Sequence, residues 1–439
     1  MPRRRTPGRP VELERDHARP RTVPAPTTQQ MDTHLQLLLY PAVFGLRDRY
    51  RGMGYRERIL SLPVMVGILL SLVWRQIASV SELQRVLARE PLLWVEPTEI
   101  SQQALSARLD ALPAELFALL WGEVLPGLQQ RAGQRPTAHA ALLAELTPAY
   151  ERVWVLDSSR LEAVFKKSGA LRGVSSTVLG GTLTTVLDLA SHLPVHLWLD
   201  ASPKTNDRAI LDTVTPLVPE RTILLLDRGF SRFSFFDTLS ESGSVLVSQW
   251  GAHWVFDAVQ TLSTTTTTSD QIVQLGKYRS SRCRSPVRRI GRKDATGRWQ
   301  YWITTELDPA RLSAAQVMAL YAQRWRIEEA FLQCKRLLQL SYLWGSSANA
   351  IALQVWTTVL LYGVLVDLCG EAAMAMGVPP ERISLEMLYR SLYHYAGAVQ
   401  RGERRDFIAW LADPNQRDLG IVKRQRTRPT AKRTTTEGA

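Results

Sequence analysis

The stretch YAQRWRIEEAFLQCK, residues 321–335, decides which fold the rest of the chain supports. Residues advance by about 100° along an α-helix, so positions three, seven and fourteen residues apart lie close together. Four polar residues have this spacing and project within an arc of roughly 60°: Tyr321, Arg324, Glu328 and Lys335. A neighbouring arc is apolar and can pack against a core; it holds Ile327, Ala330, Cys334 and Leu338. The pattern predicts an anchored helix that presents one carboxylate between two cations. An ordinary surface helix with an Arg324–Glu328 ion pair has the same spacing.

The chain is long and basic. Its 439 residues favour two or three domains over a single core. Lys and Arg number 54 against 41 acidic residues, which gives a net charge of +13 and a pI near 9.9. This balance favours a polyanionic partner, with nucleic acid first and a membrane surface second.

The basic residues cluster in three segments. Residues 3–21 hold seven arginines against three acids, and residues 423–433 hold six basic residues and no acid. Both lie among Pro, Thr and Gln, so they are expected to be disordered tails that either contact phosphate or only keep the protein soluble. Residues 277–298 hold nine basic residues against Asp294 alone. Because this cluster interrupts a folded region, a contact with nucleic acid in a groove is expected there.

Cysteine usage and apolar runs indicate the compartment. Cys283, Cys334 and Cys369 are far apart and form no CxxC pair, which argues against structural zinc and favours a reducing compartment. The first twenty residues hold no apolar core, so no secretory signal is expected. The apolar runs at residues 59–74 and 355–366 are short for a bilayer, so buried helices are expected rather than membrane spans.

Residues 1–45 are predicted to be a basic, disordered lead, and residues 46–148 a helical DNA-binding region. Within it, SVSELQRVLARE (79–90) and SQQALSARLDAL (101–112) are two predicted helices, the second with a Ser cap and followed by Pro113. A tight polar connection between them would make a helix-turn-helix. The second helix would then offer side chains to DNA: Gln102, Gln103, Ser106 and Arg108. Plain helix packing explains the same pattern.

From residue 149 the pattern becomes mixed α/β. Three strands, a helix, a strand, a helix and a strand are predicted over residues 149–250, the first part of an α/β core. Residues 251–304 are predicted to be a β-rich insertion with a hairpin turn at Asp294–Gly297. Residues 305–375 complete the core with the glutamate helix. Residues 376–439 form a C-terminal helical region with a basic tail.

Three acids stand out in this arrangement. Asp157 ends a buried strand, Asp227 ends another and opens the turn DRGF, and Glu328 lies on the anchored helix. Carboxylates brought together repel each other unless divalent cations neutralise them. An oxygen-rich site without soft ligands selects Mg²⁺ or Mn²⁺. Two such ions can activate water and stabilise the leaving oxygen at a phosphodiester, while Arg324 and Lys335 grip phosphate. Each aspartate alone could equally cap a turn, and other strand acids compete: Asp188, Asp200 and Glu162.

These motifs resemble those of bacterial insertion-sequence DDE transposases, in the group marked by a Tyr-x2-Arg-x3-Glu-x6-Lys signature (insertion-sequence-four-like). Tyr321, Arg324, Glu328 and Lys335 match the signature at every spacing. Asp157 in VWVLDSS looks like the first catalytic aspartate, and Asp227 in LLLDRGF looks like the second. The resemblance covers roughly residues 55–370.

The resemblance implies an α/β fold with a ribonuclease-H-like catalytic core, a β-rich insertion, and helical N- and C-terminal regions. It implies metal-dependent nicking of transposon ends and joining to target DNA. Asp157, Asp227 and Glu328 would hold two Mg²⁺ ions, for which Mn²⁺ can substitute. The implied partners are the terminal inverted repeats of the element, target DNA and a second copy of the chain when two ends are paired. The implied location is the bacterial cytoplasm, at the nucleoid.

Several DNA contacts are expected from the same resemblance. Tyr321, Arg324 and Lys335 would bind phosphates near the cut, with Arg228 of the DRGF turn beside them. A tryptophan of the insertion could stack on a flipped base; Trp302 is the first candidate and Trp299 the second. Trp302 could equally pack the hairpin.

Two other classes of function remain open. A transposase-derived DNA-binding protein without catalysis would keep the basic surfaces. The presence of all three acids and of the complete signature argues against such a loss of catalytic residues. A glycosidase could use Asp157 and Asp227 as an acid/base pair, but it leaves the basic clusters unexplained.

Overall fold

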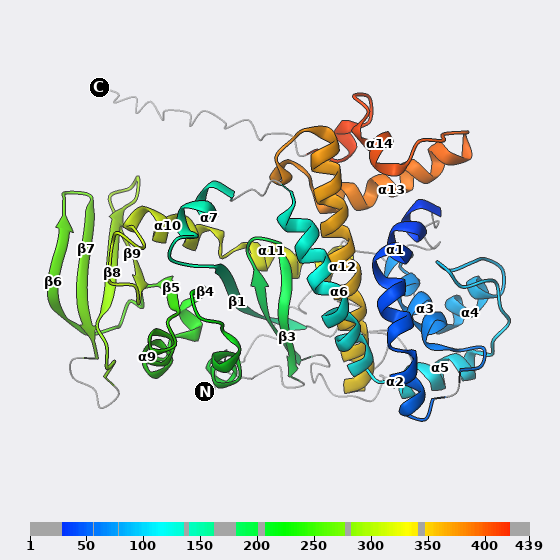
Figure 1. Cartoon of the computed structure of the whole chain (residues 1–439), viewed down its shortest axis with the longest axis horizontal. Helices are drawn as coiled ribbons and strands as arrows, with labels where there is room; N and C mark the ends of the chain where they lie inside the picture. The colour runs from blue at the N-terminus through cyan, green and yellow to red at the C-terminus, as the bar shows by residue number, and fades with distance from the viewer. Residues whose placement is uncertain are drawn as a thin grey trace, which may run out of the picture.

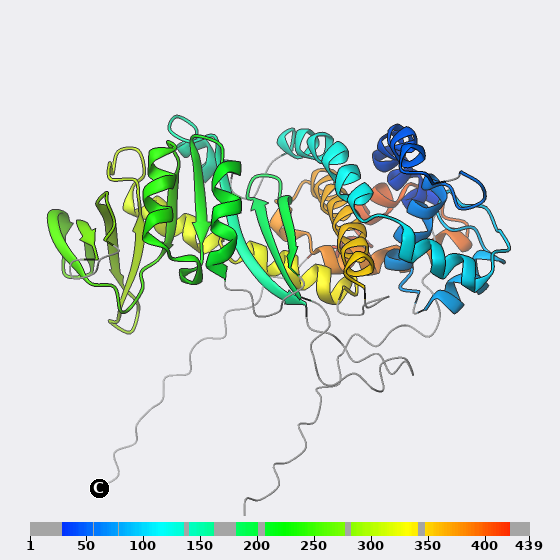
Figure 2. The ribbon, with the colours of Figure 1, turned by 90° about the horizontal axis from the view of Figure 1, so that it is seen from below.

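The computed structural model describes residues 29–55, 57–77, 79–135, 140–161, 181–200, 207–276, 282–340 and 347–421. A helical region lies at one end, a mixed sheet occupies the middle, and the outer strands of that sheet form the other end (Figures 1 and 2). The two basic tails and residues 277–281 of the central basic cluster lie outside the described residues.

Within the described residues, nine strands form one mixed sheet (Figure 1). They are β1 Arg152–Leu161, β2 Gly181–Asp188, β3 Leu193–Asp200, β4 Thr222–Leu226, β5 Val245–Gln249, β6 Phe256–Thr264, β7 Thr268–Leu275, β8 Val287–Lys293 and β9 Trp299–Thr304. Their order is β3-β2-β1-β4-β5-β9-β8-β7-β6. β1, β2 and β3 are antiparallel neighbours, whereas β4 runs parallel to both β1 and β5. The predicted mixed α/β class is confirmed.

Alternation along the central strands sends side chains to opposite faces of the sheet. Val153 and Val155 of β1 join one apolar core, and Trp154 and Leu156 join the other. The second core is covered by α8 (Leu211–Val214) and α9 (Phe233–Glu241). The first is covered by α10 (Ala314–Gln323), α11 (Arg326–Leu332) and the long α12 (Ala348–Met376). The sheet is therefore the middle layer between two sets of helices.

The predicted β-rich insertion is a continuation of the same sheet. β9 pairs antiparallel with β5, and β8, β7 and β6 follow outward. The predicted hairpin joins β8 to β9, where Gly297 adopts φ 81° and its N–H donates to the Asp294 carbonyl. Segments 149–250 and 251–304 therefore share one backbone hydrogen-bond network.

A buried ion pair connects this sheet extension to the segment before α10. Arg288 of β8 is fully buried and binds both carboxylate oxygens of Asp270 on β7, at 2.7 and 2.5 Å. Its third contact is the Leu312 carbonyl, at 2.5 Å, just before α10. The guanidinium therefore connects the extension to the segment that leads into the glutamate helix.

Most of the remaining helices form the helical region around α12 (Figure 1). They are α1 Gln29–Gly45, α2 Arg47–Gly52, α3 Leu62–Trp74, α4 Val80–Leu87, α5 Gln102–Ala111, α6 Glu115–Gly133, α13 Leu385–Gln400 and α14 Phe407–Ala412. The short helix α7, Ala140–Leu146, lies instead beside α10, where the Glu145 carboxylate accepts from the Gln316 amide at 3.2 Å. α12 is long and apolar enough to cross a bilayer by length and composition, but 83% of its most apolar window is buried against other elements. α12 is thus the central core helix of this region, and α3 is likewise buried.

Two predictions about the N-terminal region are wrong. The lead was expected to extend to residue 45, but α1 occupies Gln29–Gly45 and buries Leu35, Leu39 and Val43. The connection between α4 and α5 was expected to be tight and polar. It spans residues 88–101 and buries Leu92 and Val95, which form a β-bridge. An apolar connection of this length does not make a helix-turn-helix.

Candidate active site

The two aspartates belong to neighbouring parallel strands, with Asp157 inside β1 and Asp227 directly after β4. Leu156 of β1 is paired with Leu226 of β4, so the next residues, Asp157 and Asp227, are neighbours across the sheet. Asp157 lies within β1 rather than at its end, because the strand continues to Leu161 against β2. Both aspartates continue the alternation that sends Val155 and Leu225 into the core under α10 and α11. They therefore belong to the face of the sheet that the glutamate helix covers.

The glutamate helix is not the single α-helix that the spacing predicts. α10 begins with a Ser313–Gln316 capping box and ends at Gln323, α11 begins at Arg326, and a π-helix follows at Gln333–Leu337. Tyr321 and Lys335 thus lie on different helical segments from Glu328. The predicted apolar side is confirmed, since Ile327, Ala330, Cys334 and Leu338 are all buried. π-Helical turns are frequent at functional sites.

Arg324 forms ion pairs with one acid on the sheet, Asp157, and with one acid on the helix, Glu328. Its guanidinium lies 3.3 Å from the Asp157 carboxylate and 2.5 Å from the Glu328 carboxylate. It also lies 5.9 Å from the centre of the Tyr321 ring. Burial raises the pKa of the Tyr321 hydroxyl, and the charges of Arg324 and Asp227 both act on it. Four sequence-predicted residues are therefore brought together: Asp157, Asp227, Arg324 and Glu328, with Tyr321 beside them.

The surroundings of Asp157 disfavour the ionised form of its carboxyl group. Burial is the largest cause, and it raises the pKa of the carboxyl to about 6. The negative charges of Glu328 and Asp227 raise the pKa further, whereas the Ser158 N–H at 2.8 Å and Arg324 lower it. The Glu328 side chain is different, because half of its surface is exposed. A carboxyl that costs free energy when ionised is typical of functional sites.

The raised pKa of Asp157 makes a stability prediction. The pKa of Asp157 in the folded protein lies above the ordinary value of an aspartate, so ionisation of Asp157 destabilises the metal-free fold progressively as pH rises through about 6. Asp157→Asn is expected to raise the free energy of unfolding at pH 8 by on the order of 1–2 kcal/mol. The difference from wild type should vanish below about pH 4. Urea unfolding in chelator at pH 8 and pH 4 measures both values, and equal stability at pH 8 would contradict the assignment.

Lys335 reaches the same strand from the π-helix. Its ammonium group lies 2.6 Å from the Ser159 hydroxyl and 2.5 Å from the Arg160 carbonyl. Ser159 lies two residues beyond Asp157 and therefore on the same face of β1. Ser159 was not among the predicted site residues, although the alternation of side chains after Asp157 indicates its place on this face. Lys335 thus has a defined place beside the acids.

The donor set fits a hard divalent cation. Asp157, Asp227 and Glu328 offer oxygen ligands only, as Mg²⁺ and Mn²⁺ prefer. The Asp157 carboxyl, with its raised pKa, lacks enough positive charge around it. In the described structure the cation between Asp157 and Glu328 is the Arg324 guanidinium. A divalent ion held by these acids would supply the charge that one guanidinium only partly provides.

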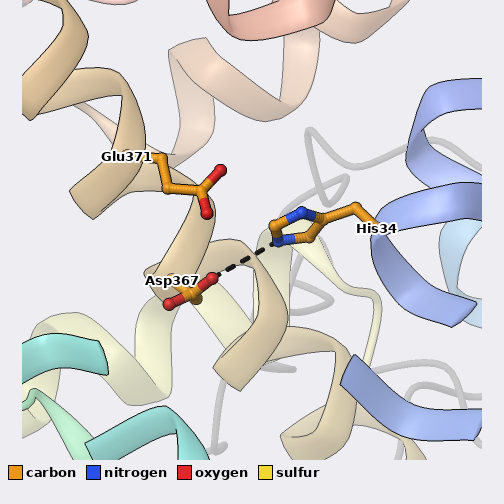
Figure 3. Close-up of side chains that lie close together, drawn as sticks. All are labelled: His34, Asp367 and Glu371. Carbon is orange, nitrogen blue, oxygen red and sulfur yellow. Dashed lines mark ion pairs between the residues drawn. The ribbon is translucent and has the colours of Figure 1, made fainter. Parts of the chain in front are cut away.

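A second acidic cluster lies elsewhere, in the helical region. His34, Asp367 and Glu371 place one ligand atom each within 4.8 Å of one another (Figure 3). His34 Nε2 is 3.4 Å from Asp367, whose carboxylate also binds Arg131 at 2.9 Å and Arg135 at 2.7 Å. Both arginines contact Glu371 as well. Despite burial, these partners hold the pKa of Asp367 well below its usual range. Because two guanidinium groups already neutralise the carboxylates, this cluster is a structural network between α1, α6 and α12.

The other predicted contact residues differ in their exposure. Arg228 is exposed in the short 3-10 turn Arg228–Phe230 after Asp227. Gln103 is exposed on α5, but Arg108 donates to the Tyr50 hydroxyl at 3.0 Å. Trp302 is 8% exposed and belongs to the apolar core, whereas Trp299 is 37% exposed. Of the two tryptophans, Trp299 has the accessible ring.

Comparison with known proteins adds a family resemblance over the same span. Residues 151–363 match a family model described as "Transposase DDE domain". A Sinorhizobium fredii protein named "Putative transposase y4zB" is 24% identical over 276 residues, which cover 61% of this chain and 72% of that protein.

One solved structure is similar over most of its length. It is that of the "piggyBac transposase synaptic complex with hairpin DNA", and the match covers 94% of this chain and 90% of that chain at 10% identity. Its TM-score of 0.42 is too low to establish a common fold. Residues 151–363 are thus similar to the DDE domain of transposases, and this span contains Asp157, Asp227 and Glu328.

Proposed function

We propose that this protein is a DNA transposase of the DDE class, in the insertion-sequence group with the Tyr-x2-Arg-x3-Glu-x6-Lys signature. The observation that carries the proposal is the meeting of three acids from distant parts of the chain. Asp157 lies within β1, Asp227 directly follows the neighbouring parallel strand β4, and Arg324 bridges Asp157 to Glu328. All three lie in the span that matches the transposase DDE domain.

The core of the sheet supports a ribonuclease-H-like assignment. Its first five strands lie in the order β3-β2-β1-β4-β5, with an antiparallel β1–β2–β3 meander and parallel β1, β4 and β5. This arrangement places both aspartates on the face that α11 covers. The fold of the core is therefore consistent with the activity that the acids suggest.

The proposed roles follow from the positions of the side chains. Asp157, Asp227 and Glu328 would hold two Mg²⁺ ions, which supply activation of water and stabilisation of the leaving oxygen at a phosphodiester. Arg324 and Lys335 lie beside the acids and can bind phosphate oxygens, with the Tyr321 ring packed against Arg324. The activity would be nicking at the ends of the element, followed by joining of the freed 3′-hydroxyl to target DNA.

The net charge of +13 supports DNA as the partner. The proposed DNA is the pair of terminal inverted repeats and a target site. Pairing two ends would require two copies of the chain. The proposed location is the bacterial cytoplasm, at the nucleoid. Gln103 on α5 and Arg228 beside Asp227 are the exposed candidates for further contacts.

The two tryptophans of β9 should respond differently to substitution. Trp302→Ala removes a buried ring, so it is expected to lower the free energy of unfolding by about 3–5 kcal/mol. Trp299→Ala removes an exposed ring that stacks on Tyr301 and makes a cation–π contact with Lys293. It should leave stability nearly unchanged and weaken binding to DNA with an unpaired base by about 1–3 kcal/mol. Urea unfolding and fluorescence anisotropy measure the two effects; an unchanged affinity for Trp299→Ala removes that residue from the DNA contacts.

The function is tested on a supercoiled plasmid that carries the DNA flanking this gene. The full-length protein is incubated with Mg²⁺ or Mn²⁺, and breaks are mapped at nucleotide resolution. Metal-dependent breaks at fixed positions are the expected result, and they identify the ends of the element. Specific binding without any breaks would favour a DNA-binding protein without catalysis. Hydrolysis of glycosides without metal would favour a carboxylate-pair glycosidase.

A further inference from the structure

A buried hydroxyl lies beside the proposed active site and has no hydrogen-bond partner. Thr185 of β2 is only 4% exposed, and its Oγ1 atom bonds to nothing among the residues that the structure describes. A hydroxyl buried without a partner costs about 1–3 kcal/mol. Such a group needs an explanation, either as a defect or as a group that acquires its partner when the site is loaded.

The strand register places this hydroxyl opposite the first aspartate. Thr185 is paired directly with Asp157 across the antiparallel β1–β2 ladder. Directly opposed residues of an antiparallel pair lie on the same face with Cβ atoms about 4.5–5.5 Å apart. Two other residues of β2, Leu183 and Leu187, share the core of Val155. The side chain of Thr185 is therefore on the face that carries the acids.

Two other threonines of the same sheet are also buried, but each differs from Thr185 in its hydrogen bonding or in its position. Thr184, on the opposite face, is satisfied by the Ser158 hydroxyl at 2.8 Å. Thr222, at the start of β4, is also buried with an unpartnered Oγ1, but it lies at the opposite end of that strand from Asp227. Thr185 combines both properties, a buried unpartnered hydroxyl and a position opposite Asp157.

In the metal-free site the Asp157 carboxylate is engaged elsewhere. Oδ1 accepts from the Ser158 N–H and Oδ2 from Arg324. A carboxylate has about four acceptor positions, so it can accept a further donor when a divalent cation displaces Arg324. A hydroxyl on the same face, already buried and uncommitted, supplies that donor without reorganisation. Partners of this kind orient a metal-binding carboxylate.

We propose that Thr185 is a positioning residue, whose hydroxyl donates to the Asp157 carboxylate and orients it for binding of a divalent cation. This inference rests on the proposed function, because it assumes that Asp157 binds metal. It assigns a role to a residue outside the three acids and outside the Tyr-Arg-Glu-Lys signature.

The test compares Thr185→Val with Thr222→Val in the full-length protein. Both changes replace a buried, unpartnered hydroxyl by a methyl group of similar shape. The dependence of Tm on Mn²⁺ concentration, fitted with a stabilisation of RT ln(1 + [Mn²⁺]/Kd), gives the metal affinity, and Tm in chelator gives the metal-free stability. Thr185→Val is expected to weaken Mn²⁺ binding about 10–100-fold with an equal or higher metal-free Tm. Thr222→Val should also have an equal or higher metal-free Tm, but it should bind Mn²⁺ with wild-type affinity. Thr185→Ser should bind Mn²⁺ as wild type does.

Different results separate the inference from the proposed function. Wild-type Mn²⁺ affinity in Thr185→Val, with loss of binding in Asp157→Asn, would overturn the role of Thr185 and leave the metal site standing. An equal rise in Tm with Mn²⁺ in wild type and in Asp157→Asn would overturn both the role of Thr185 and the metal site at Asp157. If Thr185→Val folds poorly, Thr185→Ala provides the same comparison, and retained affinity there would equally overturn the role.

Discussion

Glu328→Gln is expected to lower metal-dependent DNA cleavage by at least about a thousandfold while DNA binding stays within a few-fold of wild type. A metal ion contributes several kcal/mol of charge stabilisation in the transition state, and each 1.4 kcal/mol is about tenfold in rate. The amide keeps the shape of the side chain but removes the charge. Because half of the Glu328 surface is exposed, the fold should tolerate the change.

The adjacent glutamate is the matched control for this prediction. Glu329 pairs with Arg326 at 3.0 Å and lines a cavity of about 230 Å³ with Tyr362 and Gly363 of α12, away from the sheet aspartates. Glu329→Gln should therefore cleave DNA at close to the wild-type rate. Plasmid cleavage and DNA binding by gel shift measure the two properties in parallel. Cleavage that survives in Glu328→Gln, or is lost equally in both variants, would contradict the role of Glu328.

The second large effect concerns the sheet extension. Asp270→Asn is expected to lower the free energy of unfolding by about 3–5 kcal/mol, because it leaves the Arg288 guanidinium buried without a counter-charge. Arg288 has no exposed surface, and its remaining acceptor is the Leu312 carbonyl. Since Leu312 directly precedes α10, cleavage activity should fall together with stability.

The control for this pair removes both charges. Asp270→Leu combined with Arg288→Met replaces the buried ion pair by apolar side chains, which often restores stability. The double variant is therefore expected to unfold at a higher urea concentration than Asp270→Asn. Equal midpoints for the two variants would show that the cost arises from packing rather than from the unpaired charge.

Much of the site could be predicted from short patterns. RVWVLD and RTILLLD are apolar runs typical of buried strands, and each ends in an acid, so the sequence predicted that Asp157 and Asp227 lie close together in a sheet. Asp157 was expected at the end of its strand, but β1 continues to Leu161 against β2. The buried residues around Ile327 anchored the glutamate helix correctly. The hairpin at Asp294–Gly297 followed from turn residues between two β-rich runs.

The errors arose where tertiary contacts override local spacing. A regular 3.6-residue period cannot reveal the break at Arg324 or the π-helix at Gln333–Leu337, which redirect Lys335 onto Ser159. The pairing of β9 with β5 is non-local, so residues 251–304 gave no sign that they extend the core sheet. The apolar residues Leu92 and Val95 were overlooked inside a connection assumed to be polar.

The buried polar groups could not be predicted either, because their partners are distant in the sequence. His34 and Asp367 are far apart in the chain, and nothing local indicates that Arg131 and Arg135 meet them. The same holds for Thr185, whose significance depends on its register opposite Asp157. Partners set by strand pairing and helix packing need the three-dimensional structure, whereas residue types at fixed spacing do not.

The most direct test of the central claim is a crystal of the full-length protein soaked in Mn²⁺, with anomalous difference density measured at the manganese edge. Peaks are expected among the carboxylates of Asp157, Asp227 and Glu328, with Arg324 displaced, and no peak is expected at His34, Asp367 and Glu371. Density at the His34 cluster with none between the two strand aspartates and Glu328 would contradict the account.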